Sequence, residues 1–355
     1  MAPSDALLTT WFDEHRGFLW GLCYRITGSA ADADDLVQET FMRAIKRGPE
    51  RLHDPRRWLT RVAVNAARDA LRRRKRRAYV GPWLPTPIEM TGEEVPPSYE
   101  PVADDGRTLE GRYDLLESAS LAFLQALEGL TPTQRAVLLL SDVFDYSATE
   151  VAKALDLTVG NVRTIHHRAK RVMASYDQHR VMPATSTRAQ TQKALEQFLA
   201  FLGAGDVRGI ERMLASDVRA VSDGGGEFTA STRAILGPAR VARFFARLAA
   251  SRPGPMHITM PSLNGFPAAL FEFQVSPGRR PPRLVLSVDV NADGLISAVR
   301  VIVSSGKLAA VPFMGPGASH ALASGREAMD TLSRCQLFSE SISGRERHIF
   351  ELRRR

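Results

Sequence analysis

A run rich in proline and acidic residues, Gly81–Gly106, constrains the fold of this chain more than any other feature. Its sequence is GPWLPTPIEMTGEEVPPSYEPVADDG. Proline fixes φ and removes a backbone donor, and the apolar residues of this run follow neither a helical nor a strand period. We therefore predict an acidic, proline-rich linker over residues 81–108, with folded parts before and after it.

Residues 1–80 are predicted to form an all-helical domain. We expect an amphipathic helix at Asp5–Tyr24, a second at Ser29–Arg47, and a third that begins at the capping pair Asp54 and Pro55. In the second helix the residues expected to face inward are Leu36, Val37, Phe41, Ala44 and Ile45. Its polar face is expected to present Asp34, Asp35, Gln38, Glu39 and Arg43.

The third helix, DPRRWLTRVAVNAARDALRRRKRR from Asp54 to Arg77, has an apolar face and a basic face. At about 100° per residue, four arginines fall within roughly 60° of arc, opposite the apolar side. The basic face consists of Arg57, Arg61, Arg68 and Arg72, with Trp58 and Asn65 at its edge. A solvated face usually mixes charges, yet Asp69 is the only acid between Arg56 and Arg77. The pattern favours guanidinium contacts to phosphate and capture of an exposed base, with a solvated basic helix as the alternative.

Residues 109–180 are predicted to form a second helical domain that contains a helix-turn-helix. Ala148–Leu155 is the expected first helix, Asp156–Thr158 the turn, and Val159–Met173 the second helix. The second helix carries arginine, lysine and histidine but no acid, which suits a helix that enters the major groove. A structural helical hairpin is the alternative interpretation.

Residues 188–310 are predicted to form an α+β domain. Two helices are followed by strand-like runs, so we expect helices packed on an antiparallel sheet. The expected strands are Val218–Ser222, Met256–Leu263, Ala268–Val275, Arg283–Val290 and Leu295–Val303. Residues 311–355 have no clear pattern and are treated as a C-terminal tail without an assigned role.

Charge and cysteine content narrow the class of protein. The chain has 355 residues, a net charge of +8 and a pI near 9.8, which favours an anionic partner such as nucleic acid. Residues 1–80 carry 16 Lys/Arg against 10 Asp/Glu, or +6, whereas residues 81–120 carry 2 against 9, or −7. Two distant cysteines, Cys23 and Cys335, form neither a disulfide framework nor a metal motif. We expect no cofactor, no metal and no membrane contact, and a cytoplasmic location.

Three motifs in this order resemble the bacterial RNA polymerase sigma factors of the extracytoplasmic function (ECF) class. DADDLVQETFMRAI (Asp32–Ile45) resembles the region 2 helix that docks on the polymerase clamp. RRWLTRVAVNAARDALRRRKRR (Arg56–Arg77) resembles the part that opens and reads the −10 element. Leu127–Arg171 resembles region 4, which reads the −35 element. The resemblance covers residues 5 to about 175 and implies core RNA polymerase and promoter DNA as partners of a chain that is monomeric when free.

The resemblance assigns expected roles to individual residues. The expected −10 contacts are Arg57, Trp58, Arg61, Asn65, Arg68 and Arg72. The expected −35 contacts are Thr158, Asn161, Arg163, Thr164, His167 and Arg168. The expected polymerase contacts are Asp34, Asp35, Gln38 and Glu39. The acidic linker is expected to pass through a polymerase channel built for nucleic acid, with ordinary disorder as the alternative.

A narrower resemblance links the chain to an ECF subgroup with a fused SnoaL-like domain of the NTF2-like cone fold. That subgroup has WLPEP-type, DGGG and NPDKL-type motifs, and this chain has WLPTP, DGGG and SSGKL. SSGKL keeps only the last two residues of its motif, and Glu227 follows the glycines where a basic residue is expected. We expect a regulatory contact formed by Trp83, Leu84, Pro85, Asp223, Gly224, Gly225 and Gly226.

We predict a sigma factor that is not an enzyme and is regulated by its C-terminal domain. SnoaL-like domains include enzymes, and Asp223 or His257 could in principle act as an acid or base in a pocket. Asp223 opens a glycine turn, however, and His257 stands alone, so catalysis is disfavoured. A SnoaL-like enzyme or ligand sensor fused to a DNA-binding regulator, and an activator that binds duplex DNA without polymerase, are the alternatives. A small-molecule ligand in the C-terminal domain belongs to the ligand-sensor alternative.

Overall fold

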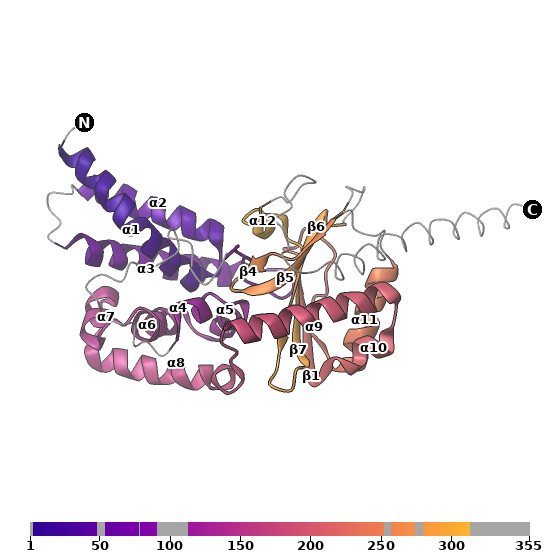
Figure 1. The fold of residues 1–355 in the computed structure, drawn as a ribbon. Coiled ribbons are helices and arrows are strands. Elements are labelled where there is room, and N and C mark those ends of the chain that lie inside the picture. The colour runs from indigo at the N-terminus through magenta and orange to yellow at the C-terminus, as the bar shows by residue number, and fades with distance from the viewer. Residues whose placement is uncertain are drawn as a thin grey trace, which may run out of the picture. The chain divides into compact units, whose positions relative to one another are not determined.

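The computed structural model describes residues 3–47, 54–77, 79–90, 113–251, 257–273 and 280–312. They belong to two compact units (Figure 1). The helical unit comprises Met1–Tyr79 and Leu84–Pro183, and the C-terminal unit comprises Val80–Trp83 and the chain from Ala184 onward. Much of the predicted linker, and the predicted tail beyond its first two residues, lie outside the described residues.

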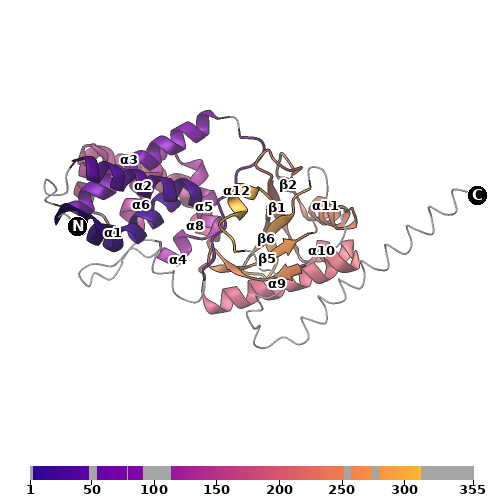
Figure 2. The same ribbon diagram turned by 90° about the horizontal axis from the view of Figure 1, so that it is seen from above.

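The helical unit contains the predicted helices of both sigma-like regions (Figure 2). Its helices are α1 (Pro3–Thr27), α2 (Ala30–Arg47), α3 (Pro55–Arg76), α4 (Leu115–Ser118), α5 (Leu121–Ala126), the 3₁₀ turn η2 (Leu127–Gly129), α6 (Pro132–Asp142), α7 (Ala148–Leu155) and α8 (Val159–His179). Helices α7 and α8 begin at the residues that the sequence predicts, α1 begins two residues before the predicted Asp5, and α8 continues six residues beyond the predicted Met173.

Side-chain caps fix the starts of the functional helices. The Asp54 carboxylate accepts from the Arg57 N–H at 3.0 Å, and Pro55 occupies the first turn of α3. Thr131 begins α6 and Ser147 begins α7, each with a reciprocal capping box. Each cap satisfies N–H groups that a helix start leaves without a partner, so the sequence defines these boundaries locally.

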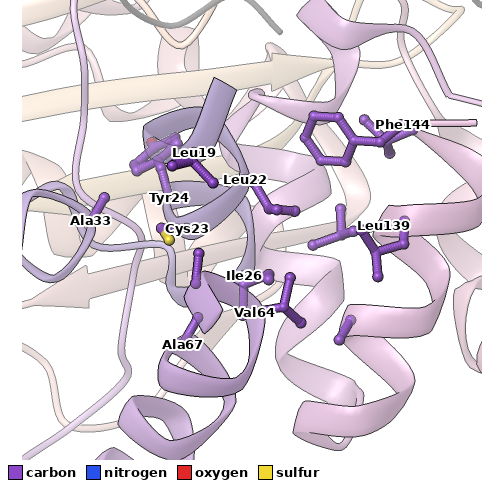
Figure 3. Packing of buried hydrophobic residues seen from close by; sticks show 14 of the residues in the cluster. Leu19, Leu22, Cys23, Tyr24, Ile26, Ala33, Val64, Ala67, Leu139 and Phe144 are labelled. Atoms are coloured by element: carbon purple, nitrogen blue, oxygen red, sulfur yellow. The ribbon is translucent and has the colours of Figure 1, made fainter. Parts of the chain in front are cut away.

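One hydrophobic core joins the helices before the linker to those after it (Figure 3). Leu19 and Leu22 of α1 and Val64 of α3 are fully buried in the same cluster as Leu139 of α6 and Phe144. The rings of Phe18 and Phe144 lie edge to face, with 5.5 Å between their centroids. Burial of this shared surface stabilises the association of the two sequence regions within the helical unit.

The C-terminal unit is an α+β fold. Its elements are α9 (Thr185–Ala204), α10 (Val207–Arg212), β1 (Leu214–Asp223), β2 (Ile235–Leu236), α11 (Pro238–Ala250), β3 (His257–Thr259), β4 (Ser262–Leu263), β5 (Phe266–Glu272), β6 (Arg283–Val290), β7 (Ile296–Ile302) and α12 (Ser305–Leu308). The strand order is β2-β1-β7-β6-β5-β3, with β4 paired to β5.

The prediction of a purely antiparallel sheet is wrong at one pair of strands. β1 and β7 pair in parallel, with Ala220 opposite Val299, whereas β5, β6 and β7 form antiparallel pairs. Hairpin connections produce antiparallel neighbours, but β1 and β7 are separated in sequence by every other strand and by α11. This distant pairing is not encoded in the pattern of either strand.

Helix α11 is missing from the sequence-based prediction. Gly237 with φ of 85° and Pro238 mark its start, and Val241, Ala242 and Phe245 are buried at helical spacing. The α11 face that includes Phe245 packs with Phe198 of α9, and the two ring centroids are 5.5 Å apart. These helices cover the sheet face that includes Leu286 and Val288, so the unit has helices packed on one face of a sheet, as the α+β prediction expects.

Candidate nucleic-acid and polymerase interface

Helix α3 presents most of the expected basic face. Arg57, Arg61 and Arg72 are exposed, while Asn65 is half-buried beside them. Arg72 pairs with Asp69 at 2.7 Å, and the side chains of both residues are about half exposed. Trp58 is half-buried, and the Arg47 guanidinium lies 5.8 Å from the centroid of its ring. Arg57 and Arg61 are therefore the arginines of this face best placed to meet phosphate.

Arg68 differs from the other arginines of the predicted face. It donates to the Asn65 amide oxygen at 3.0 Å and to the Thr133 hydroxyl of α6 at 2.9 Å. Burial lowers the pKa of Arg68, with a further lowering from Arg72 and an opposing effect from Asp69. In this structure Arg68 therefore connects α3 to α6 rather than standing on an open surface.

The basic run at the end of α3 also contacts residues from beyond the linker. Arg74 donates to both carboxylate oxygens of Glu128 at 2.8 Å, and Lys75 donates to the Leu130 carbonyl at 3.1 Å. Arg135, whose side chain is 1% exposed, donates to Glu128 at 2.8 Å and to the Ile26 carbonyl at 2.8 Å. These contacts stabilise the closed arrangement of the helical unit and occupy part of the six-residue basic run.

The helix-turn-helix of α7 and α8 has the geometry that the sequence predicts. Asp156 takes the left-handed conformation with φ of 57° at the end of α7, and Thr158 caps α8 by accepting from the Asn161 N–H at 3.2 Å. Val162 and Met173 turn into the core. The six expected −35 contacts are all exposed: Thr158, Asn161, Arg163, Thr164, His167 and Arg168.

A buried contact orients α8 from its other side. The His166 Nε2 lies 2.7 Å from the Asp142 carboxylate at the end of α6, where the Asp142 side chain is 7% exposed. Tyr176 donates to Glu117 at 2.9 Å near the other end of α8. Burial raises the pKa of Glu117 despite opposing contributions from Tyr176 and Arg180. These two contacts fix the rotation of α8 about its axis, which determines which side chains face outward.

The expected polymerase-binding face lies on α2. Asp35 and Gln38 are exposed, and Glu39 pairs with Arg43 one turn later. Asp34 accepts a hydrogen bond from the Trp20 indole N–H at 2.7 Å.

The predicted inward orientation of Ile45 is wrong, because its side chain is 52% exposed. Sequence reasoning also missed Met42, which is 53% exposed. Met42 lies seven residues after Asp35, on the same stripe of α2 as Gln38 and Glu39. An apolar residue on an otherwise polar face of a helix is a sequence signal for a contact surface, and this signal could have identified Met42.

The glycine turn and the linker tryptophan meet at a lysine that sequence reasoning did not select. Lys307 of α12 donates to the fully buried Asp223 at 2.6 Å, and its ammonium lies 4.1 Å from the centroid of the Trp83 ring. Both the linker residues Val80–Trp83 and this turn belong to the C-terminal unit. SSGKL shares only its last two residues, Lys307 and Leu308, with the NPDKL-type motif. This match was the sequence signal that could have identified Lys307.

The backbone of the turn explains its glycines. Gly225 has φ of 62° and donates to the Asp223 carboxylate at 3.0 Å. A Cβ on Gly224 would lie 2.6 Å from the Phe228 carbonyl oxygen. The turn therefore positions the Asp223 carboxylate toward Lys307, and the Gly225 N–H is already used within the turn.

The linker passes from one unit to the other within WLPTP. Val80–Trp83 belongs to the C-terminal unit, and the chain belongs to the helical unit from Leu84 onward. Leu84 and Pro85 are buried. Thr86 is held by two hydrogen bonds, from its N–H to the Gly28 carbonyl at 2.8 Å and to its carbonyl from the Tyr24 hydroxyl at 2.7 Å.

The residues considered for catalysis do not form an acid–base pair. Asp223 is engaged by Lys307, and His257 is half-buried on β3 opposite Glu272 of β5. Among the described residues, no group of three His, Cys, Asp or Glu side chains could hold a metal ion. Within the same part of the chain, no helix is both long and apolar enough to cross a membrane.

Comparison with known proteins agrees with this geometry. The Sigma-70 region 2 model matches residues 11–77, and the Sigma-70, region 4 model matches residues 120–173. The ECF RNA polymerase sigma factor SigJ of Mycobacterium tuberculosis (strain ATCC 25618 / H37Rv) is 31% identical over 247 residues, covering 69% of this chain and 73% of SigJ. SigG of Mycobacterium tuberculosis (strain CDC 1551 / Oshkosh) is 32% identical over 305 residues, covering 79% and 77%.

The fold comparison extends the similarity into the C-terminal unit. The crystal structure of Mycobacterium tuberculosis SigJ superposes with a TM-score of 0.65 at 26% identity, covering 86% of this chain and 99% of that chain. The predicted fold class, helical regions 2 and 4 followed by an α+β domain, is confirmed. The chain therefore belongs to the ECF RNA polymerase sigma factors, the proteins that direct RNA polymerase in transcription initiation.

Proposed function

We propose that this sigma factor reads a −35 element through α8, reads and helps to melt a −10 element through α3, and docks on core polymerase through α2. The exposed, acid-free outer face of α8 within a capped helix-turn-helix is the observation that carries this proposal. Exposed Arg57 and Arg61 support phosphate contacts by α3, and exposed Asp35 and Gln38 support docking by α2. Core polymerase and chromosomal DNA place this action in the cytoplasm.

In the closed helical unit, internal contacts occupy part of the basic face of α3. Arg68 and Arg74 bind Thr133 and Glu128, which belong to the region after the linker. Opening of these contacts would free two guanidinium groups of α3 for the phosphate backbone. We propose that promoter binding exchanges these internal partners for phosphates.

We further propose that the C-terminal unit regulates the sigma regions by holding the linker, and that it has no catalytic role. Lys307 forms an ion pair with buried Asp223 and a cation–π contact with Trp83 at the same time. A cation–π contact contributes roughly 0.5–2 kcal/mol between its exposed and desolvated limits, which is enough to bias the position of a short proline-bracketed segment. The same segment continues into the helical unit at Leu84. The contact between Lys307 and Trp83 is therefore intramolecular, and its two partners have a high effective concentration.

Lys307→Met tests the regulatory proposal, because methionine keeps the unbranched shape and most of the length of lysine and removes its charge. Run-off transcription with core polymerase should change at least severalfold in this variant, and Trp83→Leu should change it in the same direction. Lys193→Met on α9 is the matched control, because Lys193 is exposed and outside this cluster. If both variants transcribe like the wild type and the control, the linker contact has no regulatory role.

A further inference from the structure

The C-terminal unit carries a row of exposed arginines that the contacts described above do not use. Arg240, Arg243 and Arg247 of α11 are all exposed. At 100° per residue they fall within roughly 60° of arc and extend about 10 Å along the helix. Pro238–Ala250 contains no acidic residue. We call these three residues the α11 arginine row.

The α11 arginine row has no internal partner in the described part of the chain. By contrast, buried and half-buried basic residues of the unit have partners, as in Arg300 with Asp289 at 2.6 Å and Lys307 with Asp223. The three arginines of α11 form no ion pair or hydrogen bond with any described residue. Their opposite neighbours on the helix, Val241 and Phe245, are buried in the core, so the row faces away from the sheet.

The surroundings of the row are also basic. Residues 184–312 carry 15 Lys/Arg against 9 Asp/Glu, or +6. Helix α10 lies beside α11 in Figures 1 and 2 and packs against it. It adds exposed Arg208 and Arg212 against one exposed acid, Glu211. Nearby acidic residues do not neutralise this excess of positive charge, so the surface attracts a polyanion.

We infer that the α11 arginine row binds the phosphate backbone of duplex DNA upstream of the −35 element. Guanidinium groups bind phosphate bidentately, and duplex DNA presents about one negative charge per 1.7 Å of its axis. Residues 180–184 alone join α8, the helix that meets the −35 element, to α9. Five residues span at most about 18 Å, so the chain keeps the start of α9 near the end of α8. This inference rests on the proposed −35 reading by α8.

The test is the salt dependence of promoter binding by the complex of the full chain with core polymerase. One duplex carries a promoter mapped by transcription and extends about two helical turns, roughly 20 base pairs, upstream of the −35 element. A second duplex ends at the −35 element. Arg240→Gln with Arg243→Gln is compared with Lys193→Gln with Arg280→Gln, which removes the same charge at two exposed sites outside the row.

The α11 variant should lower the slope of log affinity against log salt by roughly two units on the long duplex, because each lost phosphate contact removes about 0.9. It should match the wild type on the short duplex, and the control should match the wild type on both. An unchanged slope on the long duplex overturns the inference. An equal loss of slope on both duplexes, together with weaker binding to core polymerase, also overturns the inference and identifies an acidic polymerase surface as the partner. Failure of wild-type binding to the short duplex instead contradicts the proposed −35 reading itself.

Discussion

The Glu128 carboxylate forms the ion pairs that join α3 to the helices after the linker. Removing its charge should therefore strongly destabilise the helical unit. Its carboxylate accepts from Arg74 and from Arg135, each at 2.8 Å. Glu128→Gln keeps the shape of the side chain and removes its charge. Arg135, with 1% of its side chain exposed, would then lack a charged partner in a buried site.

The expected loss follows from the burial of the group. Removing one partner of a buried ion pair costs about 3–5 kcal/mol. The Glu128 side chain is 26% exposed, and Arg135 and Arg74 also donate to the carbonyls of Ile26 and Thr27. We therefore expect about 3 kcal/mol at neutral pH, the lower end of that range. Glu39→Gln is the control, because it breaks an exposed pair with Arg43 that contributes only about 0.3–0.5 kcal/mol.

The effect of Glu128→Gln should depend on pH. Burial by itself would raise the pKa of Glu128, but Arg135 and Arg74 hold that pKa below its usual range. A carboxyl with a lowered folded-state pKa contributes its full stability above its unfolded pKa of about 4.3 and loses it as the pH falls through the folded value. The difference between wild type and variant should therefore be largest near neutral pH and shrink below about pH 4.

Urea unfolding followed by tryptophan emission measures this difference. In a Trp83→Phe background the remaining tryptophans are Trp11, Trp20 and Trp58, all in the helical unit. A Glu128→Gln variant as stable as its parent at neutral pH would refute the reasoning. So would a loss of stability that stays constant down to acidic pH, because that would show that charge on Glu128 does not contribute.

Three further predictions concern other surfaces. Arg57→Ala with Arg61→Ala should lower the salt slope of promoter binding by roughly two units without changing urea unfolding, and an unchanged slope would remove these residues from the interface. Asp35→Lys with Glu39→Lys should abolish binding to core polymerase while circular dichroism stays unchanged, and normal core affinity would refute docking through α2. Gly225→Ala should destabilise the C-terminal unit by about 1–3 kcal/mol in thermal unfolding, because its φ of 62° is left-handed and a Cβ would lie 2.7 Å from the hydroxyl of the residue that precedes α12. Equal melting temperatures would contradict this.

Local signals account for the parts of the fold that the sequence predicted well. Caps at Asp54, Thr131, Ser147 and Thr158 determine where the functional helices begin, and each cap bonds within three residues. The strand β6, Arg283–Val290, matches its predicted bounds because alternate side chains enter the core. The outward face of α8 was predictable for the same reason, since its period and cap are both local.

The parts that were missed depend on contacts between distant residues. Arg68 has the spacing of the exposed arginines, and only the approach of Thr133 turns it into an internal contact. The parallel pairing of β1 with β7 and the meeting of Trp83 with Lys307 likewise join segments far apart in sequence. Periodicity reports which side of an element is apolar, but not which partner lies there.

Transcription from genomic DNA with purified core polymerase tests the central claim most directly. The full chain, core polymerase and fragmented genomic DNA of the source bacterium are combined, and the 5′ ends of the transcripts are mapped. We predict discrete start sites that require both proteins and share two sequence elements at constant spacing. Arg163→Ala with Arg168→Ala on the exposed face of α8 should weaken selection of the upstream element alone. Absence of such start sites, together with sequence-specific binding to duplex DNA without core polymerase, would contradict the account and support a DNA-binding activator instead.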